Sequence, residues 1–98
     1  MGFVHVNISI RGITEAEARS GLPNLLDEFR HRHWLLNPSA VWDTTLARLT
    51  VAIDYKGDDP KLCGQAVLDE VRDCLVATVQ TESDIHFEIN DSRLVPAV

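Results

Sequence analysis

Histidine, arginine and carboxylate side chains occur at alternating positions in three short stretches of this sequence, near its start, its middle and its end. Imidazoles exchange protons near neutral pH, and guanidinium groups bind carboxylates or phosphates through paired hydrogen bonds. On one surface, such groups could bind a small polar or anionic ligand, with Arg11 and Arg48 as its clamps. The candidate ligand-binding residues are His5, Asn7, Arg11, Arg48, Asp54, His86 and Glu88.

The same stretches could support catalysis or metal binding instead. An imidazole of His5 or His86 beside Glu88 is the minimum for general acid–base chemistry, because the carboxylate orients the ring. These three side chains could also form a metal site of two imidazoles and one carboxylate. The chain has no CxxC, HExxH or acidic calcium-loop pattern, so we expect no metal and no cofactor. A small enzyme or metal-binding protein is the alternative to a binding module.

Residues 3–11, 46–55 and 85–89 alternate between apolar and polar side chains, which is the pattern of strands with one buried face. The apolar face of the first strand comprises Val4, Val6, Ile8 and Ile10. The candidate polar residues occupy the opposite face of each strand. We therefore expect them to lie together on the exposed face of a sheet.

Two helices are predicted from their starting residues. Thr14 and Glu17 fit a capping box, in which each side chain satisfies a backbone N–H of the other residue. Pro23 interrupts the first helix, so we expect a kink or two short helices there. The second helix, residues 60–78, begins after Asp59, which is a suitable N-cap and is followed by proline.

The segment between residues 34 and 45 predicts an edge strand broken by a bulge or turn. Pro38 cannot donate a hydrogen bond to a neighbouring strand, and an edge tolerates this. Trp34 and Trp42 are large for such a strand, and each could fill the core or clamp the hairpin. If exposed, they are our candidate interface residues, because tryptophan is enriched at interaction hot spots. We expect two copies of the chain to pair through this edge as a homodimer.

Four consecutive basic residues, 30–33, end the first predicted helix. They would interact favourably with the negative C-terminal end of the helix dipole. They could also form a patch that binds an anion. The sequence leaves both interpretations open.

The predicted element order is strand, helix, strand, strand, helix, strand. Right-handed crossovers fold this order into a ferredoxin-like α+β sandwich, with an antiparallel sheet in the order 4-1-3-2 and both helices on one face. At the level of fold, the chain resembles small ligand-sensing or protein-pairing modules. It lacks the glycine-rich anion loop of acylphosphatases and the paired strand aromatics of RNA-binding members.

The composition limits the partners and the compartment. The chain has 98 residues, enough for a single domain, and a net charge of -6, which disfavours nucleic acid and anionic membrane surfaces. It has no apolar run of membrane-spanning length and no signal-peptide pattern, so we expect a cytoplasmic protein. Cys63 and Cys74 lie about 16 Å apart along the second predicted helix, too far for a disulfide, and we expect buried reduced thiols.

We therefore expect a small cytoplasmic binding module that forms a homodimer and binds a protein partner or a small polar ligand on its open sheet face. A plain solvated face is the competing interpretation. Its charged side chains would then form only cross-strand ion pairs, each worth roughly 0.2–1 kcal/mol.

Overall fold

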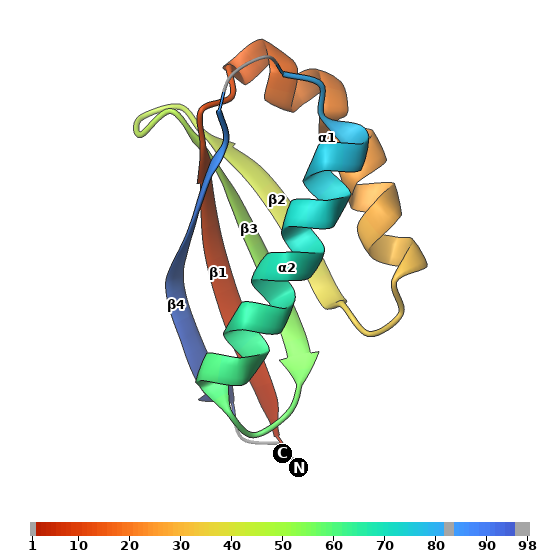
Figure 1. The fold of residues 1–98 in the computed structure, drawn as a ribbon, viewed down its shortest axis with the longest axis vertical. Helices are drawn as coiled ribbons and strands as arrows, with labels where there is room; N and C mark the ends of the chain where they lie inside the picture. The colour runs from red at the N-terminus through yellow and green to blue at the C-terminus, as the bar shows by residue number, and fades with distance from the viewer. Residues whose placement is uncertain (1, 82–83, 96–98) are drawn as a thin grey trace.

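The computed structural model describes residues 2–81 and 84–95. Four strands form one antiparallel sheet in the order β2-β3-β1-β4, and both helices pack on the same face of it (Figure 1). This is the ferredoxin-like α+β fold and the strand order that the sequence predicts. The elements in chain order are β1 (Phe3–Arg11), α1 (Glu15–His31), β2 (Leu36–Asp43), β3 (Arg48–Lys56), α2 (Pro60–Thr78) and β4 (His86–Val95).

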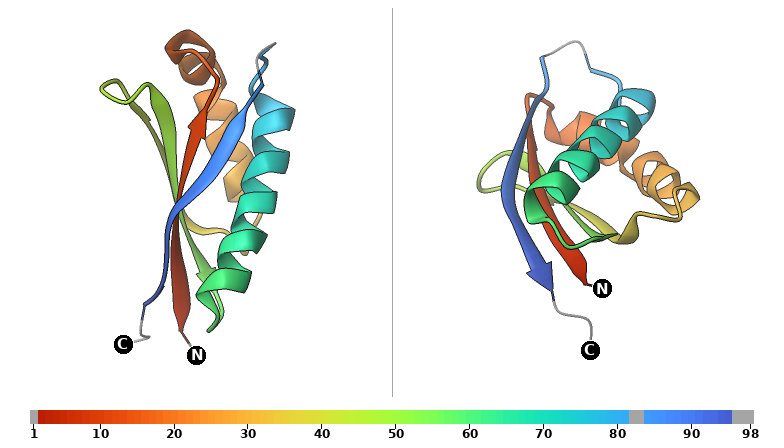
Figure 2. Two further views of the ribbon diagram at one scale, coloured as in Figure 1. Left: turned by 60° about the vertical axis from the view of Figure 1, so that its left-hand side comes forward. Right: turned by 60° about the horizontal axis from the view of Figure 1, so that its bottom comes forward.

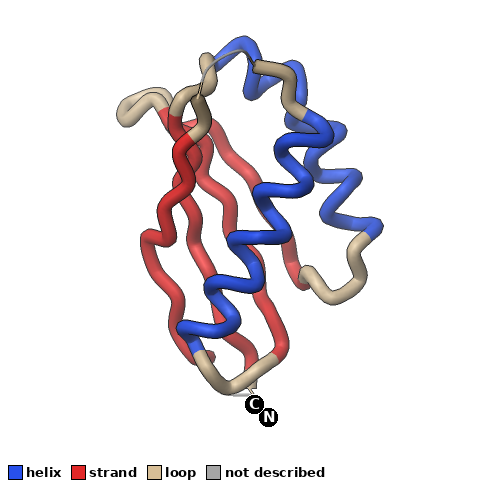
Figure 3. Tube along the Cα trace, viewed as in Figure 1, coloured by secondary structure: helices blue, strands red, loops and turns tan. Residues whose placement is uncertain are grey.

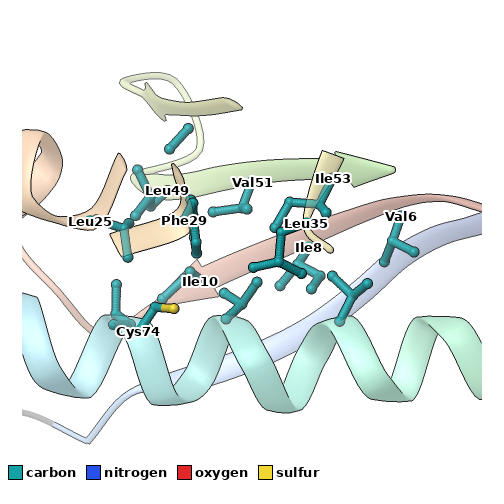
Figure 4. Close-up of a cluster of buried hydrophobic side chains, with 14 of the residues drawn as sticks. Val6, Ile8, Ile10, Leu25, Phe29, Leu35, Leu49, Val51, Ile53 and Cys74 are labelled. Carbon is teal, nitrogen blue, oxygen red and sulfur yellow. The ribbon is translucent and has the colours of Figure 1, made fainter. Parts of the chain in front are cut away.

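The core lies between the sheet and the two helices. The sheet is one layer of the molecule and the helices are the other, as the edge-on view shows (Figure 2). Every second residue of β1 points into this core and is fully buried, as the alternation predicts. Phe29 and Leu25 of α1 and Cys74 of α2 meet the strand side chains there (Figure 4). The opposite face of the sheet carries no helix.

Both helices begin where the sequence predicts a cap. The Thr14 hydroxyl accepts a hydrogen bond from the Glu17 N–H at 3.1 Å, and the Thr14 N–H donates to the Glu17 carboxylate at 2.8 Å. The Asp59 carboxylate accepts from the first free N–H groups of α2. Helix α1 continues through Pro23 as one helix that bends along its length (Figure 3), so the predicted kink is confirmed and the predicted break is not.

Strand β2 is an edge strand, as predicted, and its pairing with β3 is interrupted between Leu36 and Ser39. Asn37 has a φ of 49°, which asparagine tolerates better than most residues, and Pro38 follows it. Strand β3 begins at Arg48, two residues later than position 46, where the sequence predicts it to start. The delay arises because the Asp43 carboxylate accepts the Leu46 N–H at 3.1 Å and closes the turn between the two strands.

Strand β4 differs most from its prediction. The sequence alternation ends at residue 89, and the residues beyond Asp91 show no pattern, which predicts a loose end or a partner-bound arm. The strand continues to Val95, so the prediction of a loose end is wrong as far as Val95. The reason is a β-bulge: Ile89 pairs with Ile8 and Asp91 with Asn7, which leaves Asn90 as an extra residue. Residues 96–98, the rest of that predicted tail, lie outside the described residues.

Two smaller expectations concern the helices. Cys63 and Cys74 are both buried and unpaired on α2, as the spacing predicts. Among residues 2–81 and 84–95, neither helix has the length and apolar character needed to cross a membrane.

Candidate functional site on the open sheet face

The face of the sheet opposite the helices, here called the open face, carries the candidate residues. The pairing of β1 with β3 places His5 beside Asp54, Asn7 beside Ala52, and Ser9 beside Thr50. On its other side, β1 pairs with β4, where Arg11 lies beside His86 and Ser9 beside Glu88. All seven predicted ligand-binding residues are thus on this face; Asn7 lies near the middle of β1, and the others form two groups toward its opposite ends.

The first group is a hydrogen-bonded cluster around Asp54. The His5 Nδ1 atom lies 2.5 Å from one Asp54 carboxylate oxygen, and the Asn37 side-chain amide donates to the other oxygen at 3.0 Å. The His5 and Asp54 side chains are 29% and 26% exposed. Partial burial acts to raise the pKa of the Asp54 carboxyl, but the hydrogen bonds from Asn37 and His5, with the charge on His5, outweigh it and lower the pKa.

The second group lies at the far end of β1. Arg11 and His86 are exposed neighbours there, and Arg11 has no ion pair with any described residue. Arg48 is engaged differently, because its Nε atom is buried and lies 3.7 Å from the Asp43 carboxylate. Of the two predicted arginine clamps, Arg11 is the more exposed, and the buried Arg48 Nε atom has no hydrogen-bond partner among the described residues.

The structure separates His5 from the other two residues of the alternative metal site, whereas His86 and Glu88 lie two residues apart on the same face of β4. His5 and the partner of His86 on β1 are six positions apart, which is roughly 20 Å along an extended strand. Glu88 lies toward the His86 end, opposite Ser9. In the described ranges, no group of three or more histidine, cysteine, aspartate or glutamate side chains is arranged to hold a metal ion.

Between the two groups runs a band of small uncharged side chains, here called the neutral strip. Ser9 in this band is only 1% exposed, and its hydroxyl accepts a hydrogen bond from the Asn90 amide at the β4 bulge. Val41 of β2, 63% exposed, lies beside Thr50 at the margin of the band. The neutral strip comprises Asn7, Ser9, Ser39, Thr50 and Ala52.

The two tryptophans occupy different environments. Trp42 pairs with the buried Leu49, so the strand alternation directs it to the helix side, where it is half-buried against the core. It is not free to form the predicted edge contact. Trp34 is 49% exposed, but it lies in the turn that precedes β2 and not within the strand.

One member of the Asp54 cluster, Asn37, is absent from the sequence-based set. Its only sequence signal is its position before Pro38 in a broken edge strand. The bulge that turns its amide toward Asp54 depends on pairing between β2 and β3. A shallow hollow of about 140 Å³ adjoins the cluster, lined by Phe3, Leu36, Asn37, Asp54 and Val95.

The chain was compared with protein-family models, with curated proteins and with solved structures. None of the three comparisons found a match.

Proposed function

We propose that the protein is a small binding module that acts through its open sheet face, and that its first partner there is a second copy of the same chain. The observation that carries the proposal is the neutral strip. Here the centre of the face presents small, uncharged groups.

Several charged residues around the strip already have partners within the chain, whereas Glu88, opposite Ser9 on β4, has no ion pair with a described residue. Asp54 is bound by His5 and Asn37, Arg48 lies near Asp43, and the Arg93 guanidinium lies 3.7 Å from the Asp91 carboxylate. An approaching surface would leave these paired groups in place and would meet Glu88 at the β4 margin of the strip. The centres of protein interfaces are likewise depleted of charged residues.

The same pairing favours a protein surface over a small polar ligand at the Asp54 cluster. Both carboxylate oxygens of Asp54 already accept hydrogen bonds, and the adjoining hollow is small and mostly apolar in its lining. A polar ligand would have to displace existing contacts. A flat apolar or neutral protein surface would leave them in place.

A second copy of the chain is the simplest such surface. Two-fold dimers are the commonest soluble assemblies, and their interfaces must be self-complementary. A neutral strip of small side chains meets this requirement because it presents no like charges to its own copy. The net charge of -6 on each chain opposes association at long range, so added salt should strengthen the dimer.

Native mass spectrometry and light scattering after size exclusion test the proposal. We expect wild-type protein to have twice the 11.0 kDa chain mass. Thr50→Arg places a long cation in the neutral strip of both copies and should weaken the dimer at least about tenfold, because like charges are brought together. The matched control is Gln65→Arg, which adds the same charge on the exposed side of α2.

The two variants separate an interface effect from an unfolding effect. Circular dichroism should show wild-type secondary structure for both, because an arginine at either position can extend into solvent. A wild-type monomer at every soluble concentration, or a Thr50→Arg dimer as tight as Gln65→Arg, would contradict pairing through the open face.

A further inference from the structure

A second hollow, of about 290 Å³, lies at the sheet edge near the end of β3, outside the neutral strip. It forms because the two strands at this edge differ in extent. Strand β2 begins at Leu36, opposite Asp54, whereas β3 continues to Lys56. The turn before β2 passes beside this unpaired end of β3. The hollow is lined by His33, Trp34, Leu36, Tyr55 and Lys56.

The backbone of Lys56 is directed toward this edge. The Gly57 N–H donates to the Gly2 carbonyl at 3.1 Å, so Gly57 and Gly2 form a hydrogen-bonded pair of the ladder between β3 and β1. Hydrogen-bonded and non-bonded pairs alternate in antiparallel sheets. The next pair, Lys56 with Phe3, is therefore non-bonded, and the Lys56 N–H and carbonyl point away from β1. No backbone hydrogen bond joins Lys56 to the described turn before β2.

The basic stretch at residues 30–33 divides into used and unused groups. The Arg30 guanidinium lies 3.2 Å from the Asp27 carboxylate. The Arg32 guanidinium lies 2.5 Å from the Glu70 carboxylate and 3.3 Å from the Glu28 carboxylate. The His31 Nδ1 atom is hydrogen-bonded to the Asp27 backbone carbonyl, one turn earlier in the same helix, at 2.8 Å.

His33 and Lys56, both lining the hollow, have no hydrogen bond or ion pair with any described side chain. The two carboxylates nearest in sequence to Lys56 are already bound, Asp54 by His5 and Asn37, and Asp58 by the Gly2 N–H at 3.1 Å. The free donors of the hollow therefore suit an anion, although the chain as a whole is acidic.

The remaining walls are aromatic and apolar. Trp34 is 49% exposed and Tyr55 is half-buried, so both offer ring surface, and Leu36 adds an aliphatic side chain to the lining. A cavity of about 150 Å³ holds one benzene ring. The volume here admits one ring with a short anionic substituent and is at the lower limit of typical ligand pockets.

From this combination we propose that the hollow binds a small aromatic carboxylate. The ring lies against Trp34 and Tyr55, and the carboxylate accepts hydrogen bonds from the Lys56 ammonium group and backbone N–H, with the His33 ring beside it. This site is separate from the pairing of open faces and does not depend on it.

Titration of ¹⁵N-labelled protein with benzoate, followed by NMR, tests the site. The indole N–H signals of Trp34 and Trp42 provide a direct readout, and a Trp34→Phe variant assigns them. We expect the Trp34 signal to shift with a millimolar dissociation constant, as suits so small a ligand, while the half-buried Trp42 signal stays in place. Cyclohexanecarboxylate and benzylamine, which lack the aromatic ring and the anion respectively, should each bind more weakly.

Lys56→Gln should weaken benzoate binding about five- to tenfold, since it removes the charge-assisted hydrogen bond. Lys61→Gln is the matched control, because it removes the same charge from an exposed position on α2. Equal affinities in these two variants, stronger binding of benzylamine than of benzoate, or no Trp34 shift at any benzoate concentration would overturn the proposal. Benzoate binding can be measured on the monomer or on the dimer. Failure of the benzoate experiment would therefore not decide whether the open faces pair.

Discussion

Substitution of Asp54 by asparagine is the sharpest test of how the open face is organised. Asp54→Asn keeps the size of the side chain but replaces one acceptor oxygen with a donor. The His5 ring and the Asn37 amide then compete for a single acceptor, and the charge that strengthens both hydrogen bonds is lost. We expect the folded state to be destabilised.

The size of the effect follows from the contacts and their exposure. A neutral hydrogen bond contributes about 0.5–1.5 kcal/mol to stability, and one to a charged group about 1.5–3 kcal/mol. Because roughly a quarter of each side chain is in contact with solvent, we place the loss at about 1–2 kcal/mol, nearer the lower figures. For a domain of this size, each kcal/mol lowers the melting temperature by about 4–8 °C.

The loss should depend on pH in a defined direction. The pKa of the Asp54 carboxyl is lower in the folded protein than its usual value, so the ionised carboxylate stabilises the fold. This contribution is complete above the unfolded-state pKa, about 3.9, and disappears as the pH falls through the lower folded-state pKa. Wild type and Asp54→Asn should therefore differ fully at pH 7 and converge below about pH 4.

Urea unfolding followed by circular dichroism between pH 3 and pH 7 measures this difference. Asp73→Asn is the control, because Asp73 is exposed on α2 and forms no hydrogen bond or ion pair with a described residue. A difference between wild type and Asp54→Asn that is absent at pH 7, or that is as large at pH 3 as at pH 7, would refute the reasoning.

Two further predictions concern the core and a turn. Burial raises the pKa of the Cys74 thiol to about 11. At pH 8 we therefore expect iodoacetamide to label Cys74 only when urea unfolds the chain. Peptide mass mapping measures the labelling, and rapid labelling of the native protein would contradict this prediction. Gly12 has a φ of 98°, and a Cβ atom there would lie 2.1 Å from the Asp84 carbonyl oxygen. Gly12→Ala should therefore lower the free energy of unfolding, measured by urea titration, by more than about 1 kcal/mol. An unchanged urea midpoint would refute that assignment.

The parts of the fold that depend on residues close together in the sequence were predictable from the sequence alone. The cap at Asp59, the capping box of Thr14 and Glu17, and the alternation of β1 are local signals, and the structure confirms each. Right-handed crossovers then leave few ways to order four strands, so the sheet order was also accessible.

The site depends on register, which the sequence does not specify beyond the choice of face. Alternation places His5 and His86 on one face but does not give their separation along β1, and the pairing puts them at opposite ends. Asn37 joins the cluster only through the interrupted pairing of β2 with β3. A core role was one of the two roles open to Trp42, and only the register of β2 with β3, which pairs it with Leu49, shows that it faces the helices.

The extra residue at Asn90 has a consequence for how the length of this chain can vary. Before the bulge, odd-numbered residues of β4 such as Ile89 face the helices; beyond it, even-numbered residues do, and the Ser92 hydroxyl donates to the Pro60 carbonyl at 2.6 Å. Removing Asn90 would leave every remaining β4 residue opposite its present β1 partner and on its present side. The strand would straighten, and the hydrogen bond from Asn90 to Ser9 would be lost. An insertion or deletion of one residue elsewhere in a strand would exchange buried and exposed side chains. Position 90 is thus a place where homologous sequences can differ by one residue and keep the same two surfaces.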